Sequence, residues 1–120
     1  MLPHQNLALR IIEQAIEEAR RDRYRYHVAQ KTAGWTVKVF MDGNCIYYGN
    51  VSSGADAVLS ALRFIDDSVD AAIAWLEGDD CKVLCEELGI GERHETITNW
   101  VRLGCPKPED ARRLKLEIMS

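Results

Sequence analysis

The chain has 120 residues, of which 47% are hydrophobic and 28% are charged, and its formal net charge at pH 7 is −4. This length allows one compact core or two small lobes that share it, and the composition excludes a disordered or collagen-like chain. The negative charge argues against a general affinity for nucleic acid, because Lys and Arg supply most non-specific binding to phosphates. The acidic excess lies in residues 68–120, which carry eleven acidic and seven basic side chains.

The apolar runs are short, and the N-terminal MLPHQN lacks the basic and apolar regions of a signal peptide. We therefore expect a cytoplasmic protein without a membrane segment, and reduced thiols rather than disulfides. Alternatively, the cysteines could bind zinc. The ligands of such a site would be Cys81, Cys85, His94 and Cys105. The short knuckle pairs of such sites are missing, and Cys81 and Cys85 fit the inner face of a helix. We expect buried thiols, no metal and no cofactor.

Residues 7–22 have the spacing of an amphipathic helix, with an inner stripe of Leu9, Ile12, Ile16 and Ala19. The helix runs into RRDRYRYH, residues 20–27, in which arginines alternate with tyrosines. Such a run can contact phosphates and bases. The preferred interpretation is a helix end whose positive charges complement the helix dipole, followed by a strand.

WTVKVFM and CIYYGNV, joined by the turn residues Asp42, Gly43 and Asn44, form the strongest hairpin signal of the chain. Residues 24–30 are either a third strand or a continuation of the helix, and their alternation favours a three-stranded meander. Ser52 or Ser53 can then cap a helix over residues 55–65. The predicted fold class is α+β, with a helix, an antiparallel two- or three-stranded sheet and a second helix in residues 1–67.

This order of elements, and the stretch WTVKVFMDGNCIYYGNVSSGADAVLSALRF, resembles double-stranded RNA-binding domains over residues 7–65. In that family a lysine pair at the start of the second helix binds phosphates. The matching stretch here, residues 53–56, contains no cation. The resemblance therefore implies a topology, and we do not infer RNA binding from it.

Residues 68–120 are predicted to form a helical lobe. Asp66, Asp67 and Ser68 interrupt the preceding helix, and further helices follow over residues 69–76 and 81–88 and after Pro108. The last helix is expected to pack through Ala111, Leu114 and Ile118. Trp75 and Trp100 should be buried close to each other, because each lies on an apolar stripe.

DAAIAWLEGDDCKVLCEELGI, together with LALRIIEQAIEEAR, resembles a group of small bacteriophage and prophage proteins that have no established activity. The match consists of three short segments, namely residues 74–76, 83–85 and 88–89. The chain departs from that group by the hairpin in its middle. The resemblance implies a phage or prophage origin.

LGIGERHETITNWVRLGCPKPEDARRL also resembles the helix-turn-helix of phage repressor-type regulators, with residues 88–90 as the turn and residues 96–100 starting the recognition helix. Short polar side chains at the start of such a helix reach phosphates and base edges. The expected DNA contacts are Arg93, Thr96, Thr98, Asn99, Arg102 and Lys107. The turn is longer than is usual in that family, and Glu92 and Glu95 would face the DNA.

Two functions remain open. The first is a DNA-binding accessory or regulatory protein, and the second is a non-enzymatic module that binds a protein, for example a phage factor acting on a host system. A continuous positive surface from Arg93 to Arg113 would favour DNA, and an acidic one a protein partner. We find no enzyme motif, and the edge of the short meander suggests a homodimer.

Overall fold

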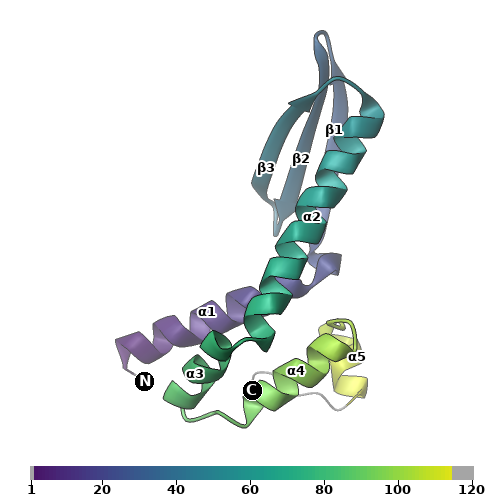
Figure 1. Cartoon of the computed structure of the whole chain (residues 1–120). Coiled ribbons are helices and arrows are strands. Elements are labelled where there is room, and N and C mark those ends of the chain that lie inside the picture. The colour runs from purple at the N-terminus through teal and green to yellow at the C-terminus, as the bar shows by residue number, and fades with distance from the viewer. Residues whose placement is uncertain (1, 115–120) are drawn as a thin grey trace. The chain divides into compact units, whose positions relative to one another are not determined.

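The computed structural model describes residues 2–114, which have the predicted α+β fold (Figure 1). The elements are α1 (Pro3–Ala19), the 3-10 helix η1 (Arg21–Arg23), β1 (Tyr24–Lys31), β2 (Gly34–Met41), β3 (Asn44–Val51), α2 (Gly54–Glu77), α3 (Asp79–Glu87), α4 (Arg93–Arg102) and α5 (Pro108–Arg113). Within these residues no helix combines the length and the hydrophobicity needed to cross a membrane.

The chain divides into two compact units, a helical unit of residues 1–20 and 70–120 and a sheet unit of residues 21–69. We predicted lobes of residues 1–67 and 68–120, so the difference lies mainly in α1. Its inner side chains Ile12, Ala15 and Ala19 belong to the same buried cluster as Leu76 and Cys81. Hydrophobic packing therefore groups the N-terminal helix with the C-terminal ones.

The sheet is antiparallel with the order β1-β2-β3, so residues 24–31 form the third strand that alternation favoured. Gly34 starts β2 at a φ of +141°, and a Cβ at this position would lie 2.8 Å from the carbonyl oxygen of Val51. Only glycine fits this close approach, which helps to fix the register of β2 against β3.

The first part of α2 lies along one face of the sheet (Figure 1). The ring of Tyr47 stacks on Phe64 with 4.7 Å between the ring centroids, and its hydroxyl is 2.9 Å from the hydroxyl of Ser60. Val37 and Val39 lie on the same face of the sheet as Tyr47 and are fully buried. The result is a small sheet with one face covered and the other open to solvent.

The expected interruption at residues 66–68 was wrong, because α2 is one continuous helix. Its apolar stripe continues through this stretch, since Ile65, Val69, Ala72 and Leu76 recur at intervals of four, three and four residues and are all buried. Asp66 forms an ion pair with Arg21 instead of capping a new helix. The predicted cap at the start of α2 is confirmed, because Ser53 accepts a hydrogen bond from the backbone N–H of Asp56.

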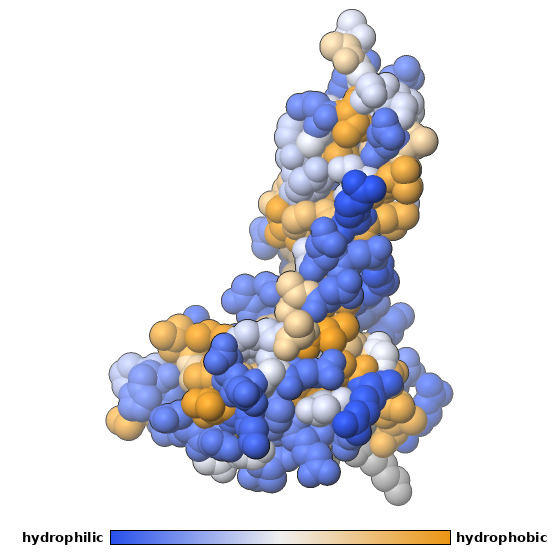
Figure 2. Space-filling view, viewed as in Figure 1, coloured by the Kyte–Doolittle hydropathy of each residue, from blue (hydrophilic) through white to orange (hydrophobic). Residues whose placement is uncertain are grey.

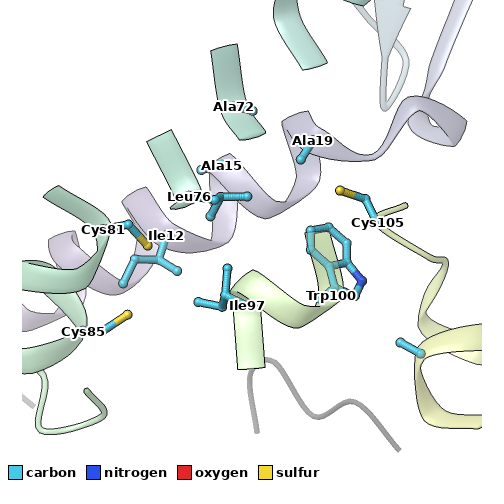
Figure 3. Packing of buried hydrophobic residues seen from close by; sticks show 11 residues of the cluster. Ile12, Ala15, Ala19, Ala72, Leu76, Cys81, Cys85, Ile97, Trp100 and Cys105 are labelled. Atoms are coloured by element: carbon cyan, nitrogen blue, oxygen red, sulfur yellow. The ribbon is translucent and has the colours of Figure 1, made fainter. Parts of the chain in front are cut away.

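The helical unit encloses a cluster of small and branched side chains around one tryptophan (Figure 3). Trp100 is 1% exposed, and its indole N–H donates to the carbonyl oxygen of Pro106 at 3.0 Å. Trp75 packs against the same cluster but is only half-buried, so the prediction of two buried tryptophans is confirmed in full for Trp100 alone.

The helix predicted after Pro108 is α5, and its Ala111 is buried as expected. Leu114 is 50% exposed, so the expectation that it packs inward was wrong. Ile118 lies outside the described residues.

Candidate nucleic-acid interface

The predicted DNA-binding residues lie on and around α4, which follows α3 after a five-residue connection, residues 88–92. The helix begins at Arg93, three residues before the predicted start of the recognition helix at Thr96. Thr98 and Asn99 consequently lie in the middle of α4. They are not at its N-terminus, where backbone N–H groups would help to hold a phosphate.

The helix separates the predicted contacts into two groups. Thr98, Asn99 and Arg102 share one face and line an open hollow of about 510 Å³ between α3 and α4. Arg93 and Thr96 are half-buried, because helical spacing places them on the side of the buried Ile97. Lys107 is exposed but lies beyond α4, at the residue that precedes α5. No single helix face therefore presents all six residues.

The hollow between α3 and α4 has more negative than positive charge. Its lining includes three carboxylates and two cations, namely Asp79, Glu92 and Glu95 against Lys82 and Arg102. The Thr98 hydroxyl donates to the backbone oxygen of His94 at 2.8 Å, so its proton is already used within the helix. Hydrophilic residues dominate the surface where α3 and α4 lie, with a few apolar ones between them (Figure 2).

The cations that follow α4 do not extend into a continuous positive surface. Arg113 forms an ion pair with Asp110, and Arg112 donates to the backbone oxygen of Pro108. Glu109 adds a further negative charge in the same short helix. The sequence of the helical unit as a whole has fourteen acidic and nine basic side chains, a formal net charge of −5. This charge balance is not that of the continuous positive surface expected for DNA binding.

The cysteines of the helical unit are buried thiols. Burial raises the pKa of Cys81 to about 12 and that of Cys105 to about 11, and it also raises the pKa of Cys85. A metal-binding cysteine must be a thiolate, which these environments disfavour. Within residues 2–114 no group of three or more His, Cys, Asp or Glu side chains is placed to hold a metal ion.

Three arginines of RRDRYRYH make contacts within the sheet unit. Arg21 pairs with Asp66 and Arg23 pairs with Asp42, while Arg25 donates to the backbone oxygens of Asp22 and Tyr24. The run follows α1 and leads into β1, so the predicted helix end and strand are confirmed. The last turn of α1 contains no basic residue, so the predicted complement to the helix dipole is not seen there.

The open face of the sheet is a surface that the sequence analysis did not identify. Because side chains alternate along a strand, the register places rows of residues from all three strands on this face. The rows are Arg25 with Phe40 and Cys45, His27 with Lys38 and Tyr48, Ala29 with Thr36 and Asn50, and Lys31 with Gly34. The signal was present in RYRYH, because its alternation assigns arginine and histidine to one face and tyrosines to the other.

Comparisons of the chain with protein-family models, with curated proteins and with solved structures found no match. The order of α1, the three strands and α2 agrees with the topology expected from the double-stranded RNA-binding resemblance. In this chain, however, α1 belongs to the helical unit and not to the sheet unit.

Proposed function

We propose that the chain is a non-enzymatic binding protein whose α3–α4 surface contacts a protein partner. The observation that carries this proposal is the set of carboxylates in the hollow. Glu92 and Glu95 line the hollow together with Asn99 and Arg102. A phosphate backbone in this hollow would meet three negative charges, Asp79, Glu92 and Glu95, which line it together with Arg102. A protein surface with basic side chains would be attracted to them.

The mixture of groups also suits a protein interface. Asn99 and Arg102 are exposed, and arginine is enriched at such interfaces because its guanidinium binds carboxylates and backbone carbonyls through several donors. The same segment exposes two apolar side chains, since Val83 is 51% and Leu103 is 56% exposed. The partner that this chemistry fits is a predominantly basic protein surface with some apolar area.

A sequence-specific DNA-binding function is the second candidate, because Asn99 and Arg102 lie three residues apart on one exposed helix face. An asparagine can bind an adenine edge in the major groove while an arginine meets a phosphate. In that case Asn99→Ala would relax sequence preference at a cost of about 1–3 kcal/mol. Arg102→Ala would weaken all sequences alike and reduce the salt dependence.

The two candidates are separated by a selection of random duplex DNA at low salt, followed by fluorescence anisotropy on the retained sequences. We expect no sequence to be retained by the folded protein. A retained sequence whose preference is relaxed by Asn99→Ala, but not by the control Gln14→Ala on the exposed side of α1, would overturn the proposal in favour of DNA.

A photo-crosslinking side chain at position 99 tests the protein contact directly in cells. We expect one discrete protein adduct that is absent when the same group is placed at position 13, on the exposed side of α1. The adduct should be lost when Glu92 and Glu95 are both changed to Lys, because a basic partner would then be repelled. An adduct that survives this charge reversal would contradict the proposed basic partner.

A further inference from the structure

We infer that the open face of the β-sheet is a binding site for single-stranded nucleic acid. This inference goes beyond the proposed function, because it concerns the sheet unit and a different class of ligand. It rests on the charge, the exposed aromatic rings and the register of β1, β2 and β3.

The three strands contain no Asp or Glu, although the chain as a whole is acidic. The basic side chains Arg25, Lys31 and Lys38 all lie on the open face, and His27 lies between the first two. The covered face has no Lys or Arg in any strand. The strands therefore direct all their positive charge to one side, where it can attract phosphates.

The carboxylates of the sheet unit lie outside the strands. Asp42 is in the turn and pairs with Arg23, and Asp66 on α2 pairs with Arg21. Asp56 and Asp67 line a hollow formed by β3 and α2 on the covered side. Within β1, β2 and β3, no carboxylate therefore offsets the positive charge of the open face.

Aromatic rings lie among these cations. Tyr48 is 55% exposed, and its ring lies 5.9 Å from the Lys38 ammonium nitrogen. Phe40 is half-buried in the neighbouring row, diagonally across from Tyr48. A ring of this kind can stack on an unpaired base while the adjacent ammonium group meets the phosphate backbone.

The presence of both cations and an exposed aromatic ring indicates which kind of polyanion fits the open face. A duplex hides its base faces, so it would use the cations and leave Tyr48 without a role. An acidic peptide likewise offers charge but no bases to stack on the ring. Single-stranded nucleic acid is the ligand that uses both the cations and the ring, and the hydrogen-bonded sheet holds them in place before binding.

The test is fluorescence anisotropy at low salt with three labelled probes: a 15-nucleotide oligothymidylate, a 15-base-pair duplex and a poly-glutamate of similar charge. We expect the single strand to bind most tightly. Tyr48→Ala should weaken its binding by about tenfold, in keeping with the loss of one stacked base. Lys38→Gln should weaken it and make the slope of affinity against salt shallower by about one phosphate contact.

The sheet and the helical unit supply matched controls. Tyr26 is 43% exposed but lies on the other face of the sheet, so Tyr26→Ala should leave the affinity unchanged. Arg10 is an exposed cation on α1, outside the α3–α4 hollow, and Arg10→Gln should likewise have no effect. Thermal unfolding of each variant verifies that it folds.

Each contrary outcome overturns the inference. Equal or tighter binding of the duplex or of poly-glutamate would show attraction by charge alone. Equal effects of Tyr48→Ala and Tyr26→Ala would place the contact away from the open face. Absence of binding to all three probes by the folded protein would remove the site.

Discussion

The imidazole Nε2 of His94 donates a hydrogen bond to the backbone oxygen of Leu76 at 3.0 Å. His94 is in the first turn of α4, and Leu76 is in the last turn of α2, where backbone oxygens lack partners within the helix. The side chain thus links α2 and α4 through two residues that are eighteen positions apart in sequence. This contact gives His94 a structural role in place of the metal-ligand role considered from the sequence.

His94→Ala should lower the free energy of unfolding by about 1 kcal/mol, because the Leu76 oxygen loses its side-chain donor. His94→Gln retains an N–H donor and should recover part of this loss. Urea unfolding followed by tryptophan fluorescence measures both variants. An unchanged urea midpoint for His94→Ala would show that the contact contributes nothing to stability.

Trp100 should be the most sensitive position of the helical core. Trp100→Ala should cost about 3–5 kcal/mol, because it leaves a large cavity in the buried cluster. Trp100→Phe keeps most of the apolar volume but removes the N–H that donates to Pro106, so it should cost less. Leu103→Ala, at an exposed position, should change stability by less than about 0.5 kcal/mol in the same denaturation experiment.

The buried thiol of Cys81 should make stability depend on pH in the alkaline range. Its pKa is raised from 9.0 to about 12, chiefly by burial, so the folded protein keeps this proton at pH values at which the unfolded chain has lost it. The resulting stabilisation is complete below about pH 9 and decreases as the pH rises toward 12.

Comparison with Cys81→Ala isolates this effect from other groups that titrate in the same range. The stability advantage of the native protein over Cys81→Ala should shrink as the pH rises from about 9 to about 10.5, as measured by urea unfolding at each pH. A difference that stays constant over this interval would show that Cys81 does not titrate differently in the two states.

The homodimer remains a prediction, because β1 and β3 are edge strands of the sheet. Each has one side without a neighbouring strand in the sheet, and such edges pair with other chains unless they are protected. Light scattering over a wide concentration range should give a mass that rises toward twice that of the chain. A monomer mass throughout would remove the prediction.

The sequence predicted most of the fold because local patterns agree with the packing. The hairpin around Asp42 and Gly43, the Ser53 cap and the buried stripe of α2 all follow from spacing and turn chemistry. The interruption of α2 was mispredicted because Asp66 was given a capping role, whereas it pairs with Arg21, which is 45 residues away in sequence. Such a long-range contact has no local signal.

The candidate sites were harder to predict than the fold. Helical spacing explains why Thr98, Asn99 and Arg102 share a face, but the proximity of Asp79 depends on how α3 packs against α4. The open sheet face depends on the register between strands, which a sequence motif does not specify. Alternation in each strand was visible, but the match between His27, Lys38 and Tyr48 was not.

The register of β3 shifts by one residue near its start, where Val39 pairs with Tyr47 but Phe40 pairs with Cys45. Ile46 is passed over, and the extra residue turns Cys45 toward the open face. Cys45 is exposed, whereas the other three cysteines are buried. A thiol-reactive fluorophore should therefore attach to one position without any engineering, within two rows of Tyr48, and report directly on whatever this face of the sheet binds.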